Sequence, residues 1–143
     1  MGILYVCDRQ QDIIYIVWDG KVTGDDWLNH AAKLLAEPDW SHISHMITDA
    51  RTAFDTASIG DKEIKAAAVL FAAHAETLVK KKVAIVANDL FGRAIKLEAQ
   101  VSRLGVSVVV FNSVDTACIF LNIDPTDARQ RLEQLSTSLR GAA

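Results

Sequence analysis

The chain has 143 residues, which is enough for one domain, and half of them are hydrophobic, so a core can form that buries roughly two thirds of the unfolded chain's surface. Its formal net charge is -3, and Lys and Arg are scattered except at 80–82, which leaves no basic stripe for nucleic-acid phosphates. The longest uncharged apolar run is too short to span a bilayer, and the first residues do not follow the pattern of a signal peptide, so we expect a cytoplasmic protein without a membrane span.

Two apolar runs open the chain, at residues 3–7 and 13–18, and the polar segment DRQQD separates them. So short a polar connection predicts an antiparallel pair of strands. In the second run both alternating sets of side chains are apolar, which predicts a strand covered on both faces. Asp19 and Gly20 mark the predicted end of this strand.

A first helix is predicted after Thr23, which can act as its N-cap. Asp25 and Asp26 would occupy the first turn, where negative charge stabilises the helix dipole. Pro38 ends the helix. Apolar residues recur at helical spacing on its inner face: Trp27, Ala31, Leu34 and Leu35.

The segment HMITD at 45–49 predicts a third, buried strand, and a hydroxyl-rich loop follows it from Asp49 to Gly60. Ser58 is placed to cap a second helix, with Asp61 three residues later. Lys80–Lys82 would lie in its last turn, where the helix carbonyls favour positive charge. Its apolar positions are Ile64, Ala67, Ala68, Phe71, Ala75, Leu78 and Val79. Because ligands of α/β proteins usually bind at the carboxyl ends of strands, the loop is the leading candidate site.

Two short β-branched runs, VAIVA at 83–87 and SVVVF at 107–111, are typical of central strands in a parallel sheet. Asn88 or Asp89 can cap a helix between them that ends at Leu104–Gly105, and Ser113 can cap a short fourth helix. The order of elements predicts an α/β domain over residues 1–123. We expect a mixed, mostly parallel sheet of about five strands with covering helices.

Residues 124–143 predict a C-terminal amphipathic helix that extends the same domain. Asp124 and Pro125 fit the N-cap and first helical position. Its apolar stripe can pack back on the domain or pair with a second subunit, and both alternatives stay open. The stripe consists of Ala128, Leu132, Leu135 and Leu139.

Five segments carry a resemblance to a known family: GKVT at 20–23, TDAR at 48–51, KVAIVA at 82–87, VVVF at 108–111, and DTA at 115–117 with Leu121. With them the chain resembles a STAS domain, the fold of bacterial anti-sigma-factor antagonists, and more closely the SpoIIAA-like family. The resemblance covers roughly residues 3–123. It implies a domain that has no catalytic activity and no cofactor, is often a homodimer, and binds a protein partner or a small apolar ligand in a hydrophobic crevice. The candidate crevice walls are Trp18, Trp27, Phe54, Phe71 and Phe91.

The antagonists of this fold suggest a second, regulatory function. Their loop before the second helix has the form Asp-Ser-Ser/Thr-Gly-Leu-Gly, and a partner kinase phosphorylates the first Ser. On this chain the motif falls on residues 55–60, DTASIG, which makes Thr56 the implied phosphoacceptor and Ser58 a further candidate. Ala57 and Ser58 depart from the motif, since they replace its second hydroxyl residue and its first glycine.

A third interpretation is an enzyme that uses Asp49 in a polar crevice. Side chains that close a strand or open the next helix should converge at the carboxyl edge of the sheet. Hydrolysis or group transfer also needs a nucleophile held by a base, and the sequence offers no convincing Ser-His or Cys-His pair. The candidate crevice residues are Asp49, Arg51, Thr52, Phe54, Asp55, Asn88, Asp89, Phe91 and Arg93.

No metal site is predicted. His42 and His45 form the best cluster, but no Cys or Glu stands at ligand spacing from them. Cys7 and Cys118 lie far apart and form no CxxC motif, so they are expected to be partly buried free thiols.

Overall fold

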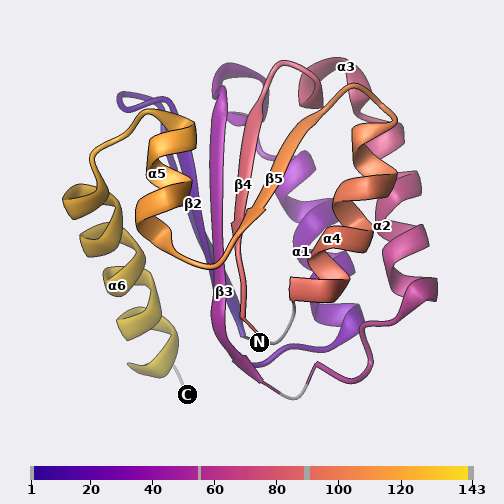
Figure 1. Cartoon of the computed structure of the whole chain (residues 1–143), viewed down its shortest axis with the longest axis horizontal. Coiled ribbons are helices and arrows are strands. Elements are labelled where there is room, and N and C mark those ends of the chain that lie inside the picture. The colour runs from indigo at the N-terminus through magenta and orange to yellow at the C-terminus, as the bar shows by residue number, and fades with distance from the viewer. Residues whose placement is uncertain (1, 55, 89–90, 142–143) are drawn as a thin grey trace.

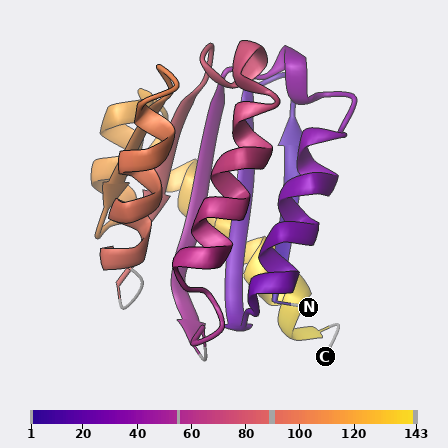
Figure 2. The ribbon, with the colours of Figure 1, turned by 90° about the vertical axis from the view of Figure 1, so that its right-hand side faces the viewer.

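The computed structural model describes residues 2–54, 56–88 and 91–141, and only the backbone of residues 91–94. A five-stranded sheet forms the middle layer, with helices on both faces (Figure 1). Helices α1 (Gly24–Leu35), α2 (Asp61–Ala72) and α4 (Phe91–Ser102) lie side by side over one face, as Figure 2 shows. Helices α5 (Val114–Leu121) and α6 (Pro125–Gly141) cover the other. The α/β prediction with a C-terminal helix is confirmed.

The strands follow one another across the sheet in the order of the chain. They are β1 (Ile3–Asp8), β2 (Ile13–Lys21), β3 (His45–Phe54), β4 (Lys82–Val86) and β5 (Ser107–Phe111). Strands β1 and β2 are antiparallel, and the other neighbours are parallel. Residues 13–18 of β2 are buried throughout, since helices cover both of its faces. This confirms the prediction for the first two apolar runs.

Strands β2 and β3 are longer than the sequence suggests. Asp19 and Gly20 do not end β2, because pairing with β3 resumes at Asp19 after a register shift that begins at Val17, and Gly20 stays in the strand with a φ of 77°. Beyond the shift, β2 pairs with β3 again, and residues 49–54 belong to β3. Pairing with a neighbouring strand therefore extends the strand into the predicted loop, which begins only after Phe54.

The predicted cap of the second helix is wrong. Helix α2 has Gly60 as its N-cap, and the Glu63 carboxylate accepts a hydrogen bond from the Gly60 N–H at 3.0 Å. The Ser58 hydroxyl instead accepts from the N–H of Gly24 at 2.9 Å, in the first turn of α1. Ser58 therefore joins the loop to a different helix.

The single long helix predicted after the loop is divided. Helix α2 ends at Ala72, and a short helix, α3 (Ala75–Leu78), follows after His74. Ile64 and Leu78 are buried as expected, but Val79 is 40% exposed. The helical stripe is thus shared between two helices, α2 and α3.

The sequence predicts that Lys81 lies in the last turn of a helix, but α3 ends at Leu78. The Lys81 side chain is buried, and Nζ donates hydrogen bonds to the carbonyl oxygens of Trp40 and Ile43. Nζ also lies 4.3 Å from the centre of the Trp40 ring, close enough for a cation–π interaction. Desolvation by burial lowers the pKa of the ammonium group. Lys81 therefore ties the start of β4 to the turn that precedes β3.

Helix α6 packs back on its own domain, which is the first of the two alternatives left open by its sequence. Ala128 and Leu132 are buried in a cluster with the side chains of β2 that face away from α1. Arg131 pairs with Asp8 at 3.2 Å. The helix therefore covers the first two strands of the sheet. None of the described helices is both long and apolar enough to cross a membrane.

Candidate functional site

An apolar cavity of about 110 Å³ lies between the sheet and helices α1, α2 and α4. Protein interiors contain few voids larger than a water molecule, so an apolar cavity of this size is unusual. Small side chains help to leave it open, because Ala31, Ala50 and Ala87 stand where larger residues would fill the layer. The lining comes from β2 to β5 and from the helices above them: Ile16, Trp18, Trp27, His30, Ala31, Leu34, Met46, Thr48, Ala50, Ile59, Ile64, Phe71, Leu78, Val83, Ile85, Ala87, Leu97, Val101 and Val108.

The cavity contains part of the predicted apolar crevice. Trp18, Trp27 and Phe71 line it, and the rings of Trp18 and Trp27 lie 6.0 Å apart. Phe54 does not, since it is 66% exposed and borders a separate surface hollow beside Arg140. The side chain of Phe91 lies outside the described residues. The aromatic wall is thus built by β2, α1 and α2.

The sequence analysis missed His30 as a site residue. The imidazole is 7% exposed and lines the cavity from α1, with its ring 5.5 Å from that of Tyr5. Burial, and to a lesser degree the charge of Lys33, lowers the pKa of His30 to about 4, so the ring is neutral at neutral pH. A signal was present in the sequence, because His30 follows Trp27 by three positions and so shares the inner face of the helix.

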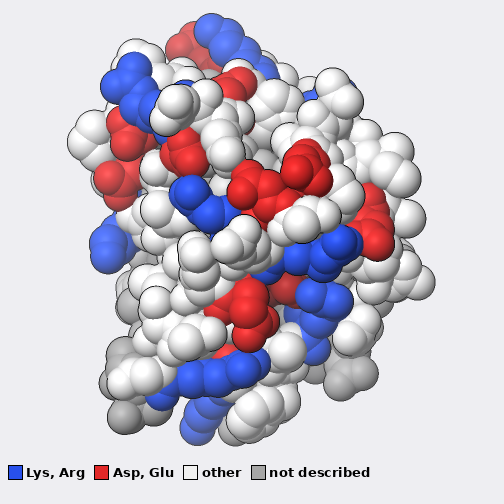
Figure 3. Space-filling model, turned by 90° about the vertical axis from the view of Figure 1, so that its left-hand side faces the viewer, with Lys and Arg blue, Asp and Glu red and all other residues white. Residues whose placement is uncertain are grey.

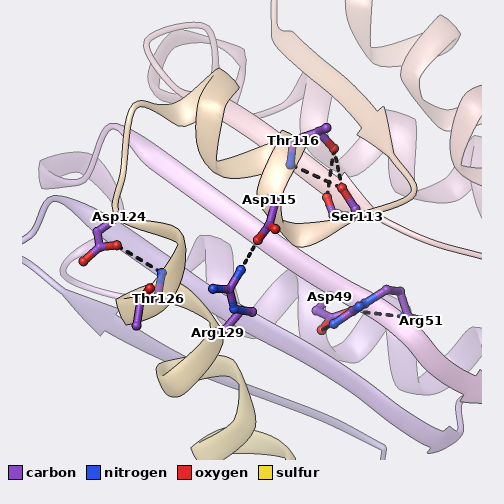
Figure 4. A network of polar contacts seen from close by, with 8 residues as sticks. All are labelled: Asp49, Arg51, Ser113, Asp115, Thr116, Asp124, Thr126 and Arg129. Carbon is purple, nitrogen blue, oxygen red and sulfur yellow. Dashed lines mark hydrogen bonds and ion pairs between the residues drawn. The ribbon is translucent and has the colours of Figure 1, made fainter.

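The polar residues predicted at the carboxyl edge are largely occupied with one another. The Arg51 guanidinium donates to both carboxylate oxygens of Asp49 at 2.9 Å, and this hydrogen bonding raises the pKa of Arg51 (Figure 4). The Thr52 hydroxyl donates to the Trp18 carbonyl at 3.3 Å. Asp55, Asp89 and the side chain of Arg93 lie outside the described residues, and Asn88 is exposed.

Around the start of α5, Figure 4 shows a network of caps and ion pairs near Asp49 and Arg51. The Ser113 hydroxyl accepts from the Thr116 N–H at 3.3 Å, which confirms Ser113 as the N-cap. Asp115 pairs with Arg129 of α6. Figure 3, which views the molecule from this side, shows Lys and Arg interleaved with Asp and Glu. The described residues on this face therefore form no patch of one charge that would attract a charged ligand.

The loop that carries the candidate phosphoacceptor reaches the cavity from the surface. Thr56 is half-buried, Ala57 and Ser58 are exposed, and Ile59 is buried. Ile59 lines the cavity, and its N–H donates to the Thr56 carbonyl at 3.0 Å. The half-buried Thr56 is thus only three positions before a residue that lines the cavity.

Within residues 2–54, 56–88 and 91–141, no group of three or more His, Cys, Asp or Glu side chains is arranged to hold a metal ion. The His45 ring nitrogen Nδ1 lies 3.0 Å from the Asp12 carbonyl oxygen and does not face a ligand set with His42. Cys7 and Cys118 are free thiols, and burial raises the pKa of Cys7 to about 11. A thiol with so high a pKa is a poor nucleophile at neutral pH.

No family model, curated protein or solved structure matches this chain. The resemblance to the SpoIIAA-like family therefore stays an expectation from sequence. What the chain can do has to be inferred from the chemistry of the cavity and of the polar edge.

Proposed function

We propose that the protein is a non-enzymatic binding domain of the STAS type that holds a small apolar ligand in the cavity between the sheet and helices α1, α2 and α4. The observation that carries this proposal is the cavity itself, whose lining is apolar except for His30, Thr48 and the indole N–H groups of Trp18 and Trp27. Small-molecule sites are concave and mostly apolar, with a few polar groups that fix orientation. Filling such a space with ligand atoms adds the dispersion contacts that its walls lack.

The rival interpretation, an enzyme at Asp49, has less support. Both oxygens of Asp49 accept from Arg51, so the carboxylate is already held in an ion pair. Ser113 caps α5 and Thr52 bonds to the backbone. These described groups already have structural partners, whereas catalysis needs a nucleophile and a base in contact.

Toluene tests the proposed cavity site. We expect saturable binding of toluene in calorimetry and a melting temperature that rises with toluene concentration, because a ligand that binds only the folded state stabilises it. Ala31→Leu places three more carbon atoms in the cavity, and we expect it to abolish toluene binding. Its free energy of unfolding should be unchanged or higher, since filling a cavity recovers lost packing.

Ala66→Leu is the matched control, since Ala66 is exposed on α2 and the substitution there leaves the cavity untouched. This variant should bind toluene like the wild type. If Ala31→Leu retains wild-type affinity, or if toluene leaves the wild-type melting temperature unchanged, the cavity is not a binding site.

A second candidate function is regulation through Thr56, and the observation that favours it is the reach of the 56–60 loop into the cavity wall at Ile59. Charge on Thr56 would lie close to the N-terminus of α2, where the helix dipole stabilises negative charge by about 0.3–1 kcal/mol. Thr56→Glu should therefore keep the fold but weaken toluene binding by displacing Ile59.

Thr56→Gln, which has the shape of Glu without its charge, is the control for that experiment and should bind toluene like the wild type. Ser58→Ala should lower the free energy of unfolding by about 1 kcal/mol, because the Gly24 N–H loses its acceptor. Equal affinities of the Glu and Gln variants in calorimetry would remove the support for a switch at Thr56.

A further inference from the structure

Besides the indole N–H groups of Trp18 and Trp27, two polar side chains interrupt the apolar lining of the cavity, and they come from opposite walls. His30 lies on α1, and Thr48 lies on β3, the middle strand of the sheet. Among the described lining residues none is Lys, Arg, Asp or Glu. A ligand in this cavity is therefore recognised through hydrogen bonds and not through an ion pair.

No hydrogen bond joins the His30 ring or the Thr48 hydroxyl to another described residue. Every described side-chain nitrogen or oxygen that is fully enclosed does have a partner. The polar atoms of His30 and Thr48 therefore border open space. Both residues line the cavity, and His30 is 7% exposed whereas Thr48 is half-buried. Buried polar groups in native proteins are hydrogen-bonded, and a molecule in the cavity can supply the partner that the buried His30 ring lacks on the described part of the chain.

The chemistry of the two side chains defines the partner. A neutral imidazole has one nitrogen that donates and one that accepts, and a threonine hydroxyl can do both. They match a ligand group that also donates and accepts. A hydroxyl group has this property, whereas a carboxylate only accepts and brings a charge that no lining residue would pair.

We propose, on the basis of the cavity function above, that the site selects compact apolar molecules that carry one neutral hydroxyl group, and that His30 and Thr48 bind this hydroxyl. The volume of about 110 Å³ is of the order of the engineered cavity of about 150 Å³ that binds benzene. The ligands that fit within it are therefore of the size of phenol.

Phenol and toluene test this proposal, because both have a six-membered aromatic ring and differ by a hydroxyl in place of a methyl group. The ratio of their dissociation constants therefore measures how well the hydroxyl is recognised. We expect Thr48→Val and His30→Leu each to raise the Kd of phenol, relative to that of toluene, by about tenfold, which is the value of one neutral hydrogen bond. Thr48→Val preserves the size and branching of the side chain, so it serves even if His30→Leu does not fold.

Thr116→Val is the matched control, since it makes the same change on α5, at the opposite face of the sheet, and should leave the ratio unaltered. The ring nitrogen signals of His30 in NMR spectra should move on addition of phenol and much less on addition of toluene. This second readout reports contact with the hydroxyl and not merely occupation of the cavity.

Each other outcome has a distinct meaning. Toluene binding with a phenol-to-toluene ratio that neither variant changes overturns hydroxyl recognition and leaves the cavity function standing. Binding of neither compound to the wild type overturns both. Benzoate binding more tightly than phenol shows that the site takes an anion, and phenol binding without a change at His30 shows that water occupies the polar end; either result overturns the proposal.

Discussion

Removal of residues 124–143 is expected to lower the free energy of unfolding by about 5 kcal/mol or more. The truncated chain would lack α6, whose Ala128 and Leu132 are buried against β2, and fully burying one large aliphatic side chain is worth about 1.5–3 kcal/mol. The loss is comparable with the total stability of a typical domain. Urea unfolding followed by circular dichroism should show a largely unfolded or aggregated protein.

Two point variants make this expectation specific. Leu132→Ala should cost about 2–5 kcal/mol, because it leaves a cavity under α6. Gln134→Ala, at an exposed position of the same helix, should change stability by less than about 0.5 kcal/mol. An unfolding curve for the truncated chain that matches the full chain would mean that α6 is not part of the folded unit.

Lys81→Met is expected to cost about 3 kcal/mol. The substitution keeps an unbranched side chain but removes the ammonium group, so the carbonyls of Trp40 and Ile43 lose their donor inside the protein. Hydrogen bonds from charged groups contribute about 1.5–3 kcal/mol, and an unsatisfied buried acceptor adds its own cost. The measurement is the free energy of unfolding in urea, with Lys80→Met as the control, since Lys80 is exposed. A wild-type value for Lys81→Met would show that these contacts contribute no net stability.

The wild type and Lys81→Met should also differ in how their stability depends on pH. Burial lowers the pKa of Lys81 in the folded state, so between this lowered pKa and the ordinary lysine value the unfolded chain binds more protons than the folded one. Stability then rises with pH across this alkaline range. The wild type should gain stability relative to Lys81→Met as the pH increases there, and parallel pH profiles would contradict the lowered pKa.

The sequence predicts those features of the fold that depend on local pattern. The strands at 3–7, 13–18, 83–87 and 107–111 are runs of apolar, mostly β-branched residues, and the structure places strands at each. Thr23 and Ser113 cap the helices they were expected to cap, because an N-cap bonds to a backbone N–H only three residues away.

The features that escape prediction depend on partners distant in the chain. Ser58 fits the pattern of a local cap, yet its hydroxyl bonds to Gly24, 34 residues earlier. Lys81 has the sequence context of a helix end, and only the fold brings the carbonyls of Trp40 and Ile43 to it. The end of β3 is likewise set by pairing with β2 and not by its own residues.

In the candidate site, too, local sequence pattern predicts some residues and leaves others unassigned. Trp18, Trp27 and Phe71 could be proposed as crevice walls because they are aromatic and lie on inner faces. His30 could be placed on the inner face of its helix by its spacing from Trp27, but the same local pattern fits a histidine that packs in the core and one that faces a cavity. The cavity arises from how α1, α2 and α4 are spaced over the sheet, and spacing between layers has no signature in the sequence.

The return of α6 to the first two strands has a consequence for synthesis of the chain on the ribosome. Each strand can pair with its predecessor as soon as it emerges, because the sheet follows the order of the chain. One face of β2, with Ile13, Tyr15 and Val17, is covered in part by α6 and stays open until residues 125–141 have been made. During translation this apolar face is the surface on which nascent chains would associate or bind a chaperone.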